Sequence, residues 1–250
     1  MIDTHPIQQI EFRGRDLERM KAFYHDGLGW EIRPAGEPLL AFALTGRLPL
    51  VQLLQTPIPE VPPGVVIYAE VPDCAAATEI AKANGAIVII EPTVAGTAGT
   101  WSLVHDPWGN ELGFWQSAPD WRPSPGAAVI HPIAWVELRA PDLVAAVRFY
   151  RKVCGWSFQV AAGVGDFAFY EASSPGRPGV GVGLVGGERA ARLQRTTVYA
   201  ATSDIEASLA GLIAAGGKLS VEPSPGPEGG RFAVVADPDG NPIGLFTAAT

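Results

Sequence analysis

A glutamate and an arginine stand two residues apart near the start of each half of the chain, in segments whose alternation indicates β-strands. The pairs are Glu11–Arg13 and Glu137–Arg139. Alternate residues of a strand point to one face of a sheet, so each pair should share a face. A carboxylate beside a guanidinium can orient a ligand or act as a general base, with the arginine stabilising developing negative charge. An ion pair that only supports the sheet fits the same pattern, and both interpretations stay open.

Other side chains that commonly carry chemistry are few and scattered. The four histidines show no HxH or HExxH spacing, and Cys74 and Cys154 form no CxxC pair. We therefore expect histidines that lie at the surface or flank turns, and no disulfide. A reducing cytosol is the simplest setting for such a chain.

Tryptophan is abundant, with seven residues in 250. Such side chains stack well on a flat hydrophobic ligand. For Trp115 and Trp135 a place in a pocket and a place in the core are both open. Trp30 and Trp156 recur after the first helix of each half, and we expect them in the core.

The elements that position these residues occur twice. Sliding the sequence by 126 positions places Glu11 on Glu137, and sliding it by 131 places DPWGN at 106–110 on DPDGN at 237–241. The chain is therefore an internal duplication, and proline marks the segment between the copies as a linker. We predict a first domain, a Pro-rich linker and a second domain over residues 1–117, 118–127 and 128–250.

Each copy repeats one order of elements. Asp16 should cap a helix that stops at Gly27, and Asp73 should cap a second helix that stops at Gly85. Strand patterns surround both helices, which predicts strand, helix and three strands, twice per copy. The fold class is α+β, with four βαβββ units, helices on one face of each mixed sheet and a concave opposite face. Asp-Pro-x-Gly-Asn should form a tight turn between the last two strands of each copy and carry no catalysis.

Two pairs of motifs carry a family resemblance. "DLERMKAFYHDGLGW" and "DLVAAVRFYRKVCGW", followed by "DPWGN" and "DPDGN", resemble the vicinal oxygen chelate superfamily. That group includes glyoxalase I, extradiol dioxygenases, fosfomycin-resistance enzymes and bleomycin-resistance proteins. The resemblance implies two tandem glyoxalase-like domains. It says less about activity, because the fold hosts metal enzymes and metal-free binders alike.

The resemblance also locates the positions that bind metal in metal-dependent members. They lie on the first, fifth and eighth strands of each domain, and here they are occupied by Gln9, Val66, Gly113, Trp135, Thr197 and Gly244. None of these residues is His, Asp, Glu or Cys, the ligands that such sites need. We therefore predict no metal and no cofactor, and we interpret the six positions, together with Trp115, as ligand-binding. At the two glycines we expect open space into which a ligand could reach.

Bulk properties limit the partners. A net charge of −8 argues against a nucleic-acid surface. No apolar run of membrane-spanning length occurs, and the N-terminal residues do not resemble a signal peptide. We expect a cytoplasmic monomer or homodimer whose partner is a small molecule.

Two functions follow. The first is a metal-independent glyoxalase-fold protein that binds a small aromatic or polycyclic compound in a cleft, as in bleomycin-resistance-like sequestration or another antibiotic-related role. The alternative is a metal-independent enzyme that tailors a secondary metabolite by cyclisation, hydration or proton transfer. In that case Glu11 or Glu137 would be the base and Arg13 or Arg139 would stabilise charge. A metal-dependent glyoxalase or dioxygenase ranks last. The identity of the ligand and the choice of cleft stay open.

Overall fold

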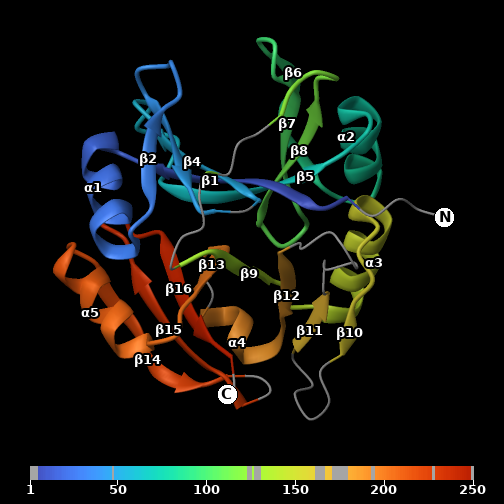
Figure 1. The fold of residues 1–250 in the computed structure, drawn as a ribbon. Helices are drawn as coiled ribbons and strands as arrows, with labels where there is room; N and C mark the ends of the chain where they lie inside the picture. The colour runs from blue at the N-terminus through green and yellow to red at the C-terminus, as the bar shows by residue number, and fades with distance from the viewer. Residues whose placement is uncertain are drawn as a thin grey trace. The chain divides into compact units, whose positions relative to one another are not determined.

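The computed structural model describes residues 5–46, 48–122, 126, 131–160, 167–170, 180–192, 195–226 and 229–248. The first half of the chain contains β1 Ile7–Gly14, α1 Leu17–Leu28, β2 Glu31–Pro34, β3 Leu40–Leu44, β4 Leu50–Gln55, β5 Gly64–Glu70, α2 Cys74–Ala83, β6 Ile87–Ala95, β7 Gly99–His105 and β8 Glu111–Ser117 (Figure 1). The second half contains β9 Ile133–Arg139, α3 Leu143–Cys154, β10 Gln159–Val160, β11 Phe167–Tyr170, β12 Gly181–Val185, α4 Gly187–Arg192, β13 Thr197–Ala201, α5 Ile205–Ala214, β14 Lys218–Pro225, β15 Arg231–Ala236 and β16 Pro242–Thr247.

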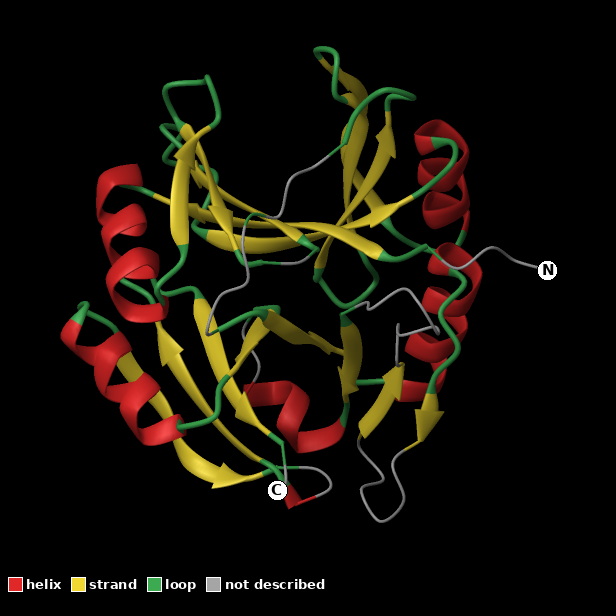
Figure 2. Cartoon of the chain, viewed as in Figure 1, coloured by secondary structure: helices red, strands yellow, loops and turns green. Residues whose placement is uncertain are grey.

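The order of strand, helix and three strands occurs four times along the chain, as predicted. The strands form two curled mixed sheets, β2-β3-β4-β1-β5-β8-β7-β6 and β10-β11-β12-β9-β13-β16-β15-β14 (Figure 2). β5 with β8 and β13 with β16 are parallel pairs, whereas β7 with β8 and β15 with β16 are antiparallel. The prediction of an α+β fold with four βαβββ units is confirmed. The short helix α4 was not predicted.

Aspartate starts four of the helices. The carboxylate of Asp16 accepts a hydrogen bond from the Arg19 backbone N–H, and Asp73 accepts one from that of Ala76. Asp142 and Asp204 cap α3 and α5 in the same way. These contacts satisfy N–H groups that the first helical turn leaves without a partner.

The predicted end of the first helix was wrong. α1 continues through Gly27 and ends at the C-cap Gly29, whose φ of +66° suits a residue without a side chain. Gly27 has a packing role, because a Cβ there would lie 2.9 Å from a methyl carbon of Leu212 in α5. A glycine does end this helix, but it is Gly29 and not Gly27.

The residues gather in two compact units, each of which takes half of each copy. Unit 1 consists of Met1–Gln9, Val66–Pro123 and Val136–Thr196, and unit 2 consists of Ile10–Val65, Ser124–Trp135 and Thr197–Thr250. Helices α2 and α3 pack together in unit 1, and α1 packs on α5 in unit 2 (Figure 1). The division of the chain at 117 and 128 stays a prediction, and linker positions 123–125 and 127 lie outside the described residues.

Helices long and apolar enough to cross a membrane are absent from the described part of the chain.

Candidate functional site: two tyrosine–glycine pairs and an aromatic face

The repeated Asp-Pro-x-Gly-Asn segments form turns, as predicted. One oxygen of Asp106 accepts hydrogen bonds from the backbone N–H groups of Trp108 and Asn110, at 2.9 and 2.8 Å. Gly109 has a φ of +86°, which favours glycine. Asp237 accepts the equivalent bonds from Asp239 and Asn241 in the second copy.

Each turn is also tied to the other copy, which the sequence did not indicate. In unit 1 the Tyr150 hydroxyl donates to Asp106, and the Asn110 side chain donates to the Arg139 carbonyl oxygen at 2.7 Å. In unit 2 the Tyr24 hydroxyl donates to Asp237 at 3.0 Å. The tyrosines of the two Phe-Tyr repeats thus hold the aspartates of the two turns.

Burial sets the electrostatics of these contacts. It raises the pKa of Asp106, and the hydrogen bonds from Tyr150 and Asn110 partly counter that rise. Burial raises the pKa of Asp237 in the same way, against the donors Asn241 and Tyr24. The pKa of Tyr150 is raised by burial and by the negative charge of Asp106, which keeps the phenol protonated as the donor.

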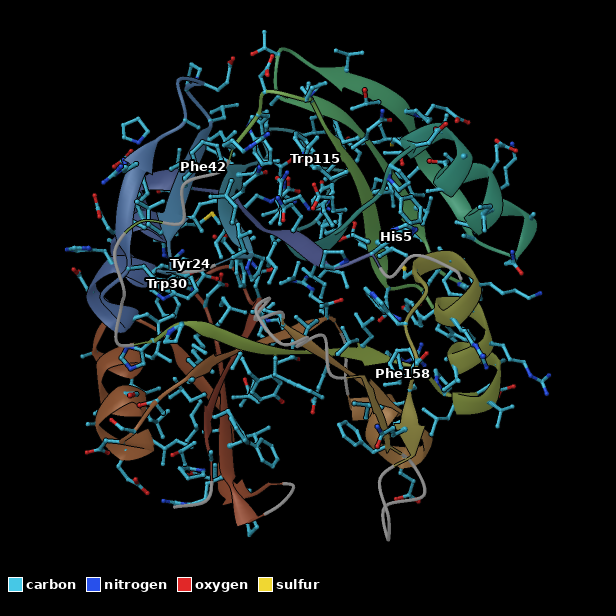
Figure 3. All side chains as sticks on the ribbon, turned by 45° about the vertical axis from the view of Figure 1, so that its right-hand side comes forward. His5, Tyr24, Trp30, Phe42, Trp115 and Phe158 are labelled. Atoms are coloured by element: carbon cyan, nitrogen blue, oxygen red, sulfur yellow. The ribbon has the colours of Figure 1, made fainter. Side chains whose placement is uncertain are left out.

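The repeated Gly-Trp and His-Pro motifs are structural. Trp30 and Trp156 are fully buried, and each stacks on the tyrosine of its copy, with ring centroids 5.4 and 5.5 Å apart (Figure 3 labels Tyr24 and Trp30). The Trp30 indole donates to the His131 carbonyl oxygen at 2.8 Å, and the Trp156 indole donates to that of His5 at 2.7 Å. The placement of both tryptophans in the core agrees with the prediction.

The first-copy positions that the resemblance assigns to metal ligands are in unit 1. Gln9 on β1 and Val66 on β5 are buried, and Gly113 lies on β8. Tyr68, two residues after Val66 on the same face of β5, is the residue paired with Gly113. A Cβ at Gly113 would overlap the Tyr68 ring.

The second copy repeats this arrangement in unit 2. Tyr199 on β13 is paired with Gly244 on β16, and a Cβ at Gly244 would overlap the Tyr199 ring. Thr197 is buried, and Trp135 on β9 is half-buried. The expectation of open space at the two glycines is wrong, because a tyrosine ring fills it in each copy.

These residues do not fit a metal ion. Valine and glycine have no donor atom in their side chains, and a glutamate could not replace either glycine without displacing a buried tyrosine. Clusters of three or more His, Cys, Asp or Glu suited to a metal are absent from the residues that the structure describes.

The two Glu-x-Arg pairs differ. In unit 2 the Arg13 Nε lies 4.0 Å from the Glu11 Oε1, and both side chains are almost fully buried. In unit 1 the Arg139 guanidinium donates to the carbonyl oxygens of Ala190 and Trp108, at 3.1 and 3.2 Å. Arg139 therefore links α4 to the Asp106 turn. The catalytic roles of all four residues stay predictions, and Glu11–Arg13 is the pair with the ion-pair geometry.

An aromatic face lies beside Gly113 in unit 1. We use this name for Tyr68, Trp101 and Trp115, which pack together with Val66 and Leu103, and Trp121 packs against the same cluster. The Trp101 centroid is 6.2 Å from that of Tyr68, and the Trp121 centroid is 5.3 Å from that of Trp115. Trp115, labelled in Figure 3, is 6% exposed and belongs to core and face at once. The sequence marked Trp115 but not Tyr68 or Trp121.

A separate cavity of about 450 Å³ lies in unit 2, lined by Arg15, Gln55, Thr56, Pro57 and Pro59. The Arg15 guanidinium donates to the carbonyl oxygens of Ile58 and Pro59, at 2.8 and 3.0 Å. Its size suits a small ligand, but its lining has no aromatic ring or carboxylate. The arginine there holds the chain after β4.

The chain belongs to the glyoxalase/bleomycin resistance protein/dioxygenase superfamily, whose family model matches residues 7–114 and 132–245. The resemblance carried by the repeated motifs is thus confirmed. The chain is similar to a curated protein of Mycobacterium bovis named "Putative glyoxylase CFP32", and to the one of that name in Mycobacterium tuberculosis. Each is 29% identical over 253 residues, covering 92% of this chain and 90% of the relative.

Solved structures of the same fold include a metal-bound enzyme. The Mn(II)-bound glyoxalase from Novosphingobium aromaticivorans matches with a TM-score of 0.68 at 17% identity, over 98% of this chain and 82% of the other. An extradiol ring-cleaving dioxygenase from B. fuscum matches with a TM-score of 0.69 at 16% identity, over 99% and 73%. Identities this low establish the shared fold alone.

Proposed function

We propose that the protein is a metal-independent member of its superfamily that binds a small aromatic or polycyclic compound. The observation that carries the proposal is the tyrosine ring packed over glycine where the resemblance implies a metal-binding glutamate, at Gly113 and again at Gly244. The aromatic face supports the choice of ligand, because indole and phenol rings stack on flat hydrophobic molecules. Sequestration, as in the bleomycin-resistance branch of the family, needs binding without chemistry.

The net charge of the chain supports a small molecule as the partner. An acidic chain with a net charge of −8 suits neither a nucleic acid nor an anionic membrane surface. We place the protein in the cytoplasm as a monomer or homodimer whose partner is the small molecule.

Anthraquinone, phenazine and acridine compounds are expected to quench the tryptophan fluorescence of the purified protein and to raise its melting temperature. Trp115→Phe should reduce the quenching, because it removes an indole of the aromatic face. Trp30 and Trp156, which are fully buried and lie outside the aromatic face, remain as reporters of the intact fold. Absence of both quenching and thermal shift with every compound would contradict the proposal.

The second candidate is an enzyme with Glu11 as general base. The burial of Glu11 beside Arg13 favours it, since a buried carboxylate next to a guanidinium can accept a proton while the arginine stabilises negative charge. Incubating the same compounds with the protein and analysing the products by mass spectrometry would detect turnover.

Any conversion found should fall about a hundredfold in Glu11→Gln. It should change little in Glu137→Gln, because Arg139 is engaged with backbone carbonyls. Equal rates in the wild type and both variants would exclude these glutamates as the base.

A further inference from the structure

A carboxylate borders the aromatic face. Glu70 is the last residue of β5, on the same face of the strand as Val66 and Tyr68, and is paired with Trp115 of β8. The Ser117 hydroxyl donates to the Glu70 Oε1 at 2.9 Å, and the Trp115 indole donates to the Ser117 oxygen at 3.1 Å. A chain of hydrogen bonds thus joins the carboxylate to an indole of the aromatic face.

The charge of Glu70 has no cationic partner within the described ranges. Its side chain has the single hydrogen bond from the neutral Ser117, and no Lys, Arg or His of those ranges forms an ion pair with it. Glu70 is half-buried. Two features at this place therefore favour a cation: the negative charge of the carboxylate and the electron-rich faces of the aromatic rings beside it.

Trp121 of the linker covers this face. Its ring lies 5.3 Å from that of Trp115, inclined by 52°. The segment is held by two backbone hydrogen bonds, from Trp121 to the Ala118 carbonyl and from Ala118 to the Ala98 carbonyl, at 3.0 and 2.9 Å. A flat ligand that stacks on Trp115 needs the space that Trp121 fills.

We propose that the aromatic face of unit 1 binds a flat aromatic cation, with Glu70 as its counter-charge, and that the cation enters by displacing Trp121. The proposal rests on the proposed binding function and deepens it by naming the charge of the ligand and the residue that controls access. Trp121, a residue of the linker between the two copies, therefore competes with the ligand for the site.

A matched pair of probes tests the charge. N-methylacridinium carries a fixed positive charge, whereas acridine has nearly the same rings and is neutral at neutral pH. Titration against tryptophan fluorescence should give about tenfold tighter binding of the cation. Glu70→Gln, which can still accept the bond from Ser117, should make the two affinities equal. Glu79→Gln, which removes a surface carboxylate of α2, should preserve the preference and so controls for net charge.

A second variant tests the displacement. Trp121→Ala removes the internal competitor and should tighten binding of both probes by about tenfold, while Trp121→Phe keeps a ring and should change it less. Equal affinities of the two probes in the wild type, or a preference that survives Glu70→Gln, would overturn the role of Glu70. Binding that Trp121→Ala leaves unchanged or weakens would overturn the displacement. Absence of binding by either probe, even in Trp121→Ala, would instead count against the proposed binding function itself.

Discussion

Alanine in place of Gly113 is expected to destabilise the protein by about 3 kcal/mol, and glutamate by more. The Tyr68 ring occupies the position of the new Cβ, so ring or strand must move within a packed layer that includes Val66, Leu103 and Trp115. Urea unfolding followed by circular dichroism measures the loss. Gly244→Ala should destabilise the protein by a similar amount, because Tyr199 packs over Gly244 in the same way.

The control is a double-mutant cycle. In a Tyr68→Ala background the ring is gone, and adding Gly113→Ala should cost almost nothing. The coupling between the two sites should therefore be about 2 kcal/mol or more. Equal costs of Gly113→Ala in both backgrounds would show that the ring is not the reason for glycine.

Tyr150→Phe and Tyr24→Phe are each expected to destabilise the protein by about 2 kcal/mol at neutral pH. Each change removes a hydroxyl that donates to a buried aspartate, Asp106 or Asp237, and leaves the aromatic packing in place. The carboxylate then keeps its backbone donors but loses the one that comes from the other copy. Urea unfolding of the two variants beside the wild type measures the effect.

The destabilisation caused by each Tyr→Phe change should depend on pH, and the aspartate pKa values set the direction of that dependence. Burial already raises the pKa of both aspartates, and loss of the tyrosine donor raises it further. Because the carboxyl pKa is raised in the folded state, the folded protein keeps this proton at pH values at which the unfolded chain has lost it. The free energy of unfolding therefore falls as pH rises above about 4. The penalty of each Tyr→Phe change should therefore be small in acid and grow toward neutral pH. A penalty that is independent of pH would contradict the role of the carboxylates.

Local signals in the sequence were sufficient for the fold. Asp16 and Asp73 cap helices through bonds to residues three positions ahead, and the Asp106 turn closes within five residues. Such contacts involve residues that are close together in the sequence, and the duplication repeats each of them in the second copy. Gly27 shows the limit, because its role depends on Leu212, which is far away in the sequence.

The candidate site was only partly predictable for the same reason. Gly113 was singled out as a position without a donor, but the ring that fills the space comes from a strand more than forty residues earlier. Trp121 and Glu70 carried no motif, and only strand pairing brings Glu70 opposite Trp115. The Glu-x-Arg repeat looked the same in both copies, yet Arg139 bonds to backbone carbonyls that no local pattern indicates.

The most direct measurement is the affinity of N-methylacridinium for the protein stripped with a chelator, compared with protein loaded with Mn²⁺, Fe²⁺, Zn²⁺ or Ni²⁺. Binding that involves no metal gives the same dissociation constant in every state, and calorimetry then detects no stoichiometric uptake of any of the ions. Affinity lost on chelation and restored by one metal, with one ion taken up per site, would contradict a metal-independent function and would require that the tyrosines over Gly113 and Gly244 move aside.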